Sequence, residues 1–188
     1  MPPKTRYTRE QVEQAAFSIA REKGLEGLNA RAIAKRLGCS TQPLYRDLNG
    51  MEEIRRAVLL RATRFFESYV RENSAQAALP YLGSGLAYLR FAKEETRLFS
   101  LLFMRSRSSE EQTQGARDAT FEYAAAQISA QLHYSLEKAR EFHYQSYIYV
   151  HGLAAMIATG FLDYDEAALA GLLRRQYRAL RLAFEAEG

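Results

Sequence analysis

Apolar residues recur at intervals of three and four along most of the chain, and no stretch alternates convincingly in the manner of a β-strand. The first such pattern begins after Thr8, a residue type that caps helices, and stops at Gly24. The second begins after Asn29 and stops at Gly38. These signals predict two helices, each preceded by a capping side chain and followed by a glycine.

A third, shorter pattern follows at once. Ser40 can cap a helix whose first turn holds Pro43, where the missing N–H group costs no hydrogen bond. The pattern ends at Gly50, so this helix is about two turns long. Because residues 38–40 form a glycine-containing turn between two helices, the layout of residues 1–50 is that of a helix-turn-helix.

The remaining chain shows longer patterns of the same kind. They predict helices at residues 51–73, from Pro80 to about 92, at 94–104, at about 117–132, from a Ser135 cap to Phe161, and from an Asp165 cap to about Glu185. The expected fold class is all-α, with about nine helices in total.

The formal net charge of +4 is located at one end of the chain. Residues 1–50 hold nine Lys and Arg residues against five acidic residues, whereas residues 51–188 hold 17 of each sign. A basic N-terminal part can attract a polyanion such as the phosphate backbone of nucleic acid. The alternative is an ordinary solvated surface, and charge alone does not decide between the two.

The short third helix can bury very little, so its first turn and outer face are left exposed. In a helix-turn-helix, the second helix of the pair lies in the major groove and its N-terminal residues touch base edges. The Gln42 amide can pair with adenine, Thr41 can hydrogen-bond a base or a phosphate, and the Pro43 ring can pack on a thymine methyl. Arg31, at the start of the preceding helix, can reach a guanine or a phosphate.

Further residues suit the DNA backbone, whose contacts fix register and do not read sequence. They are Asn29, Ser40, Tyr45 and Arg46. Asn29 and Ser40 also serve as helix caps, and Tyr45 can be mainly a core residue. These three therefore have a structural alternative that the polar residues of the first turn lack.

Residues 8–59 resemble the DNA-binding domain of the tetracycline-repressor (TetR) family along their whole length. The matching features are Ala15-Ala16, Glu22-Lys23-Gly24, Arg31-Ala32-Ile33-Ala34, Gly38, Leu44-Tyr45 and Glu52-Glu53. The resemblance implies a homodimeric transcriptional regulator, usually a repressor, that binds double-stranded operator DNA. It also implies a helix-turn-helix DNA-binding domain at residues 1–50 and a helical-bundle domain at 51–188 that dimerises and often binds a small effector.

Two positions depart from the family pattern. Where the family usually has a phosphate-anchoring lysine at the start of the fourth helix, this chain has Met51. Asp47 brings a negative charge to the side that faces the DNA backbone. These departures weaken two expected phosphate contacts and leave the expectation of DNA binding in place.

Residues 147–173 resemble the closing helix pair of one broad subgroup of this family, the pair through which such proteins usually dimerise. Geometry also favours a homodimer, because one short recognition helix covers few base pairs, and two copies about 34 Å apart are the usual solution. The resemblance implies that the two copies meet through the last two helices. The apolar residues of these helices can supply both an internal core and a partner face, and the sequence does not divide them.

Aromatic residues are plentiful after the N-terminal part: ten of the twelve tyrosines lie beyond residue 50. A tyrosine aimed into a cavity provides an apolar wall and one polar handle, which suits a small, largely hydrophobic effector. The pocket candidates are Tyr69, Tyr88, Phe103, Tyr123, Tyr147 and His151. The alternative for each is an ordinary place in the core or at its edge, with a hydrogen-bonded ring in the case of His151.

Enzyme activity, cofactors and metals are not expected. The three histidines are at least eight residues apart, about 12 Å of helix, which is too far for a local metal site. Cys39 has no evident base, and the glycines at 83–85 lack the lysine and spacing of a nucleotide-binding loop.

A membrane protein is not expected either. The longest uncharged apolar run, residues 148–162, is shorter than the roughly 18 to 20 residues that span a bilayer and contains His151. The first residues lack the apolar run of a secretory signal, so the cytoplasm is the expected location. If the protein bound a membrane surface or acted only through helix-helix interactions, that would explain the amphipathic helices and the basic N-terminal part. It would not explain why Thr41 and Gln42 are exposed.

Overall fold

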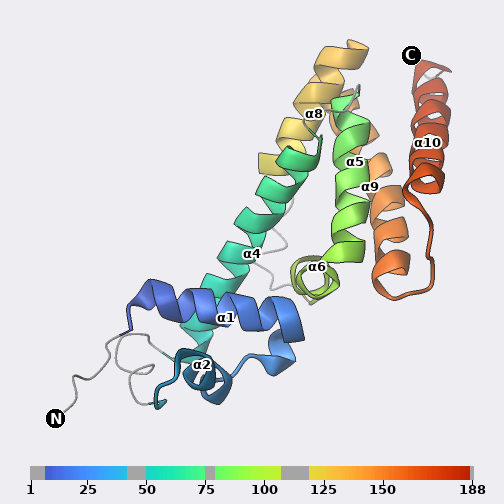
Figure 1. The fold of residues 1–188 in the computed structure, drawn as a ribbon. Coiled ribbons are helices and arrows are strands. Elements are labelled where there is room, and N and C mark those ends of the chain that lie inside the picture. The colour runs from blue at the N-terminus through green and yellow to red at the C-terminus, as the bar shows by residue number, and fades with distance from the viewer. Residues whose placement is uncertain (1–6, 42–49, 75–78, 107–118, 187–188) are drawn as a thin grey trace. The chain divides into compact units, whose positions relative to one another are not determined.

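The structure is a computed structural model that describes residues 7–41, 50–74, 79–106 and 119–186. Within these residues it contains eight α-helices, one short 3-10 helix and no β-strand, which confirms the all-α class (Figure 1). The elements are α1 Arg9–Lys23, η1 Leu25–Gly27, α2 Ala30–Leu37, α4 Met51–Ser74, α5 Pro80–Glu94, α6 Thr96–Phe103, α8 Ala119–Leu132, α9 Leu136–Ala158 and α10 Glu166–Ala186. The short helix expected after Ser40 falls on residues 42–49, outside the described part.

Contacts divide the chain into two compact units. The first unit comprises Met1–Ser68 and Glu95–Arg105, and the second comprises Tyr69–Glu94 and Ser106–Gly188. The first unit therefore includes most of α4 and all of α6 in addition to α1 and α2. The boundary expected after residue 50 separates a DNA-binding domain from an effector-binding and dimerisation domain. This functional division stays a prediction.

The ends of α1 lie where the sequence predicts them. At its start, the Gln11 N–H group donates to the Thr8 hydroxyl at 3.2 Å, and the Thr8 N–H group donates to the Gln11 side chain at 2.8 Å. This reciprocal capping box satisfies two N–H groups that the helix itself leaves unpaired. Gly24 ends the helix with φ of 73°, a value that favours glycine.

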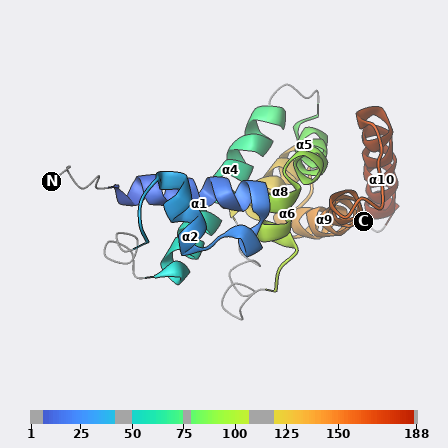
Figure 2. The ribbon, with the colours of Figure 1, turned by 60° about the horizontal axis from the view of Figure 1, so that its bottom comes forward.

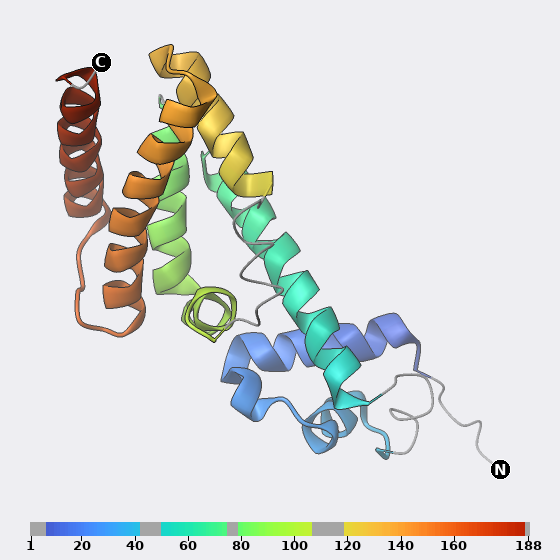
Figure 3. The same cartoon turned by 180° about the vertical axis from the view of Figure 1, so that it is seen from behind.

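The core of the first unit forms where α2, α4 and α6 bring apolar side chains to the buried face of α1. Figure 2 shows α2 beside α1, and Figure 3 shows α1 crossing the first turns of α4. Ile33, Val58 and Phe99 have no exposed surface. The rings of Phe17 and Phe65, from α1 and α4, lie 5.9 Å apart. Most of the other buried side chains of this unit are those of Ala, Val, Ile and Leu, so its core is mainly aliphatic.

The second unit is a bundle of α5, α8, α9 and α10. Helix α9 packs against both α5 and α8, and α10 packs against α5 and α9 (Figures 1 and 3). A cluster of Ile128, Ala139, Phe142 and Phe184 is buried between these helices. The Phe142 and Phe184 rings meet edge to face with centroids 5.3 Å apart, so an aromatic contact joins α9 to α10.

Helix α9 ends earlier than its apolar pattern predicts. The expected end was Phe161, whereas the structure ends the helix at Ala158. Gly160 has φ of 72°, and the Phe161 N–H group donates back to the Met156 carbonyl at 2.9 Å. This left-handed glycine ending satisfies the last carbonyls of the helix, and the apolar residues after it do not extend it.

Candidate nucleic-acid interface and effector site

Helix α2 is delimited at both ends by the residues that the sequence predicts. The Asn29 side-chain oxygen accepts from the Ala32 N–H group at 3.0 Å. At the other end Gly38 has φ of 69°, and the Cys39 N–H group donates to the Ala34 carbonyl at 3.0 Å. This ending turns the chain sharply away from α2. Ser40, which is exposed, and Thr41, which is half-buried, follow the turn.

The two arginines of α2 differ in their partners. Arg36 is exposed but engaged, because its Nη1 donates to Glu22 at 2.7 Å in a two-point contact. The same contact holds the pKa of the Glu22 carboxyl below its usual range. Arg31 is exposed and forms no ion pair with any residue that the structure describes. Of the two, Arg31 is therefore the guanidinium available to a phosphate or a base.

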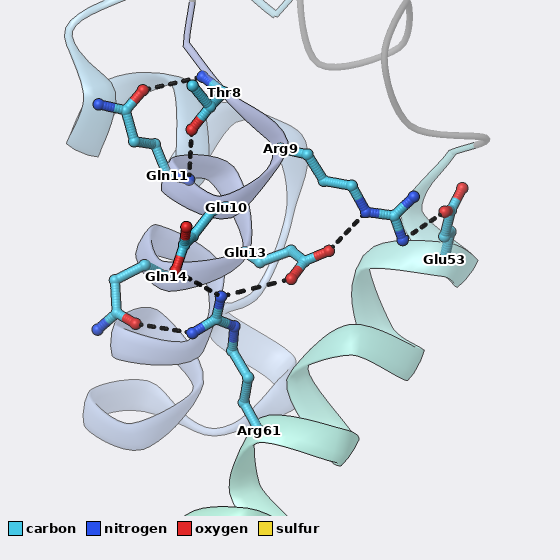
Figure 4. Close-up of polar contacts among 8 residues, drawn as sticks. All are labelled: Thr8, Arg9, Glu10, Gln11, Glu13, Gln14, Glu53 and Arg61. Carbon is cyan, nitrogen blue, oxygen red and sulfur yellow. Dashed lines mark hydrogen bonds and ion pairs between the residues drawn. The ribbon is translucent and has the colours of Figure 1, made fainter.

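Ion pairs tie the start of α4 to α1 (Figure 4). Arg9 lies between two carboxylates, 2.7 Å from Glu13 and 2.7 Å from Glu53. Arg61, from the third turn of α4, donates to Gln14 at 3.2 Å and to Glu13 at 3.5 Å. Because α4 begins directly after the expected recognition helix, these contacts anchor the chain on its C-terminal side.

One contact of this region carries no sequence signal. The Tyr7 hydroxyl donates to the Leu37 carbonyl, at the last residue of α2. It ties the residues before α1 to the start of the turn. A single tyrosine in a polar stretch shows no periodicity, so the sequence offers no means of finding this contact. Four predicted DNA-contact residues, Gln42, Pro43, Tyr45 and Arg46, lie outside the described residues.

The structure brings together three of the six effector-pocket candidates. The Tyr88 hydroxyl on α5 lies at hydrogen-bond distance, 2.9 Å, from Nδ1 of His151 on α9. The Tyr147 ring stacks on His151 with centroids 5.6 Å apart and meets the Tyr88 ring at 6.2 Å. Tyr88 is buried, whereas Tyr147 and His151 are half-buried. Together they form an aromatic wall with a polar edge.

The other three candidates lie apart from this cluster. Tyr69 packs edge to face on Phe91, with centroids 5.3 Å apart, within the second unit. Phe103 belongs to the first unit, where its ring meets Phe66 at 5.1 Å. Tyr123 on α8 is 66% exposed. The role of all six in effector binding stays a prediction.

A second tyrosine and histidine pair lies two turns away on the same two helices. The Tyr81 hydroxyl is 3.0 Å from Nδ1 of His143, and the Phe121 ring packs on His143 with centroids 4.5 Å apart. Burial lowers the pKa of His143 to about 4, and burial also raises the pKa of Tyr81. The spacing of seven residues on α5 and eight on α9 is the sequence signal that relates this pair to Tyr88 and His151.

Helices α9 and α10 divide their apolar residues between a core and an exposed face. Seven of these residues are buried: Ala139, Phe142, Ala154, Ile157, Leu169, Leu173 and Phe184. Five large ones are exposed: Leu136, Tyr144, Ile148, Met156 and Leu182. Between the two helices lies an open hollow of about 510 Å³, lined by Tyr149, Arg175, Gln176, Ala179, Leu180 and Ala183. None of the six pocket candidates lines this hollow.

Neither a membrane span nor a metal site is found among the described residues. None of the described helices combines the length and the apolar character needed to cross a bilayer. No group of three His, Cys, Asp or Glu side chains in the described ranges is arranged to hold a metal ion.

Known proteins resemble this chain in sequence and in structure. No model of a protein family matches it. It is 30% identical over 98 residues to the uncharacterized HTH-type transcriptional regulator YobS of Bacillus subtilis, a match that covers 50% of each chain. It is 42% identical over 62 residues to the HTH-type transcriptional repressor DrrR1 of Streptomyces coeruleorubidus, covering 33% of this chain and 23% of that one. The chain thus matches half or less of the length of these relatives.

Solved structures match over nearly the whole chain. A transcriptional regulator from Rhodococcus sp. Rha1 superposes with a TM-score of 0.68 at 20% identity, covering 94% of this chain and 97% of that one. A TetR-like transcriptional regulator from Rhodococcus sp. RHA1 has a TM-score of 0.66 at 17% identity, with both chains covered completely. The resemblance that residues 8–59 indicate is therefore confirmed, and the chain has the fold of TetR-like transcriptional regulators.

Proposed function

We propose that the protein is a homodimeric transcriptional repressor that binds a palindromic operator and leaves it when a small, largely hydrophobic effector binds. The observation that carries the proposal is the geometry around α2. Its left-handed ending at Gly38 leads to an exposed Ser40, while Arg31 at its other end is exposed and engaged in no ion pair with the described residues. The printed names of the relatives support regulation of transcription, and that of DrrR1 supports repression.

In this proposal the residues after the turn read the operator. Thr41, Gln42 and Pro43 meet base edges in the major groove, and Arg31 reaches a guanine or a phosphate. Asn29, Ser40, Tyr45 and Arg46 contact the backbone and fix the register. The N–H groups at the helix starts add further phosphate contacts.

Selection of bound duplexes from a random pool tests DNA recognition. The purified protein should enrich a palindromic consensus, and binding should weaken steeply as salt rises. The double variant T41A/Q42A should bind without that preference while its far-UV circular dichroism is unchanged. Enrichment of the same consensus by the double variant would contradict the assignment of these residues.

The two arginines of α2 provide a matched control. R31A should weaken binding to the selected duplex by about 1 to 3 kcal/mol if Arg31 reads a base. R36A should change the affinity little, because Arg36 is already engaged by Glu22. Equal losses in both variants would show that binding follows net charge and that neither arginine reads the sequence.

The effector part of the proposal rests on Tyr88, Tyr147 and His151. A ligand bound on their aromatic wall would favour a conformation in which α4 moves and the two recognition helices no longer match successive grooves. A differential affinity of roughly 1 to 3 kcal/mol between the two states shifts occupancy substantially.

Titration of an operator-bound sample with hydrophobic compounds, followed by fluorescence anisotropy, tests this release. Y88F should weaken the response to an active compound, because it removes the hydroxyl, whereas Y123F should leave it unchanged, because Tyr123 is 66% exposed. If no compound released the protein from the operator at saturation, the effector part of the proposal would be wrong. We further propose a cytoplasmic location, where the operator is found.

A further inference from the structure

The two tyrosine and histidine pairs belong to one continuous row of rings within the second unit. On α9, His143, Tyr147 and His151 follow one another at intervals of four residues, so they lie on one face of the helix. The centroid of the Tyr147 ring is 6.4 Å from that of His143 and 5.6 Å from that of His151. Tyr81 and Tyr88 on α5 lie at hydrogen-bond distance from the two histidines. These five residues are called the tyrosine-histidine row below.

The row extends beyond the aromatic wall to which the effector is assigned above. That wall, formed by Tyr88, Tyr147 and His151, is one half of the row, and the half around His143 has no assigned role. Eight residues of helix separate His143 from His151, a distance of about 12 Å. All three α9 residues of the row are half-buried, so part of each ring stays accessible. The row is therefore long enough for an elongated aromatic compound.

A chain of hydrogen bonds determines where the protons lie at the His143 end. Gln176 Nε2 donates to the Ser146 hydroxyl at 3.4 Å, and Ser146 is buried. The Ser146 hydroxyl bonds to Tyr81 and opposes the rise that burial causes in the pKa of Tyr81, so it donates to the phenol oxygen. The Tyr81 proton is then directed to Nδ1 of His143, 3.0 Å away. The neutral imidazole therefore carries its own proton on Nε2.

His143 thus presents an unused hydrogen-bond donor in uncharged surroundings. Its Nε2 has no hydrogen-bond partner among the described residues. Burial lowers the pKa of His143 to about 4, so the ring is neutral near pH 7, and no charged side chain of the described ranges contributes to that shift. The neighbouring rings are those of Tyr81, Phe121 and Tyr147. Such a donor favours an uncharged acceptor, because an ion would lose its hydration there without gaining a counter-charge.

We propose that the effector is an elongated, uncharged aromatic compound that lies along the tyrosine-histidine row and presents a carbonyl oxygen to Nε2 of His143. This inference rests on the effector release proposed above and names the class of compound. The rings of the row bind the apolar body, and His143 selects for the oxygen. Tyr81 is a positioning residue, because it holds the imidazole in the donating tautomer.

Matched probes test this class of compound. The ketone para-acetylbiphenyl carries a carbonyl oxygen, and para-ethylbiphenyl has nearly the same shape without it. Isothermal titration calorimetry with the whole chain near pH 7 should show the ketone binding about three- to tenfold more tightly, the gain expected from one hydrogen bond. Anionic para-biphenylcarboxylate and cationic para-(aminomethyl)biphenyl should bind more weakly than the ketone. A preference for either ion, equal affinity for ketone and ethyl compound, or no binding of either would overturn the proposal.

Variants at position 143 separate recognition of the oxygen from packing. H143L removes the donor, so the preference for the ketone should vanish while the affinity for para-ethylbiphenyl stays nearly unchanged. H143Q places an amide N–H group close to the position of Nε2 and should keep part of the preference. H133N, at an exposed histidine of the same unit, should keep all of it. If H143L and H143Q both lost both compounds, His143 would have a packing role only and the proposal would be wrong.

Nitrogen NMR of the imidazole reads the tautomer directly. The parent should carry the His143 proton on Nε2, and this resonance should move with para-acetylbiphenyl and much less with para-ethylbiphenyl. Y81F keeps the ring and removes the directing hydroxyl, so the Nδ1–H form should appear and the preference for the ketone should fall. A parent with its proton on Nδ1 would overturn the proposal, since Nε2 would then be an acceptor.

The possible failures are distinguishable. If the ketone has no advantage, or if H143L retains that advantage, the contact with His143 is wrong while release by another class of compound stands. If the ketone binds as expected but does not release the protein from its selected operator, the ligand class stands and the release part of the proposed function fails. Duplex selection with the parent reports on DNA recognition independently of both outcomes.

Discussion

The polar side chains of the two units lie in different places. In the first unit the charged groups are at the surface, where Arg9 and Arg61 link α1 to α4 through carboxylates, above a mainly aliphatic core. In the second unit, polar groups are enclosed between helices: Ser146 is buried, and the Tyr81 hydroxyl and His143 meet among aromatic rings. Each unit should therefore respond to a different perturbation, the first to salt and to helix ends, and the second to packing and to acid.

The largest expected effect is on the packing of the second unit. Phe142 has no exposed surface, and its ring meets Tyr177 and Phe184 at 5.6 and 5.3 Å. F142A should lower the free energy of unfolding of this unit by about 3 to 5 kcal/mol, through lost burial and the cavity left behind. Urea denaturation followed by tyrosine fluorescence measures it, because ten of the twelve tyrosines lie in this unit.

Tyr123 provides the control for F142A. It is also an aromatic residue of the second unit, but its side chain is 66% exposed. Y123A should change the free energy of unfolding by no more than about 0.5 kcal/mol. Similar losses in the two variants would contradict the assignment of Phe142 to the core.

Acid provides the next largest effect, through His143. Burial lowers the pKa of this imidazole from 6.5 to about 4, so the unfolded chain binds a proton that the folded chain does not between these pH values. The contribution of His143 is complete above pH 6.5 and is lost as the pH falls toward 4, at up to about 1.4 kcal/mol per pH unit. Urea titrations at several pH values should show this slope in the parent and a smaller one in H143Q. The exposed His133 supplies the control: H133N, which suits its φ of 58°, should retain the slope.

Particular residues show which parts of the fold the sequence predicts. The sequence correctly predicts four helix caps, which are Thr8, Asn29, Ser135 and Asp165. Each cap is a contact with the residue three positions later, so the local sequence is enough to predict it. The end of α9 was misplaced by three residues, since the apolar residues up to Phe161 continue the pattern that Gly160 interrupts. Helix ends follow local chemistry, and an apolar pattern alone does not locate them.

The candidate sites show where such prediction stops. Periodicity identified Tyr88, Tyr147 and His151 as aromatic residues on apolar faces, but it also identified Tyr123, which faces solvent. Which of them meet depends on how α5 packs on α9, a contact between residues about 60 positions apart. The same applies to the Tyr7 contact at the end of α2. Only the structure contains this information.

A smaller effect is expected at the end of α2. Gly38 has φ of 69°, and a Cβ atom there would meet no other atom within 4 Å, so the cost of G38A is the backbone conformation alone. The free energy of unfolding of the first unit should fall by about 1 kcal/mol, as measured by urea denaturation followed by far-UV circular dichroism. Gly85 lies inside α5, and a Cβ atom added there would make an ordinary contact with Leu173 at 3.5 Å, so G85A should raise the free energy of unfolding. If both variants changed the free energy of unfolding in the same direction, the left-handed ending at Gly38 would be contradicted.

The smallest expected effect on stability concerns the surface of the first unit. The ion pair between Arg36 and Glu22 is exposed, and water and salt screen such a pair, so R36A should leave the urea midpoint nearly unchanged at physiological salt. The pair is visible in a different measurement. The Arg36 hydrogen bonds hold the pKa of Glu22 low, and carbon NMR of the Glu22 carboxyl should show that pKa rise toward its ordinary value in R36A. A Glu22 pKa that R36A does not change would mean that the two side chains do not meet in solution, and Arg36 would then be as available to DNA as Arg31.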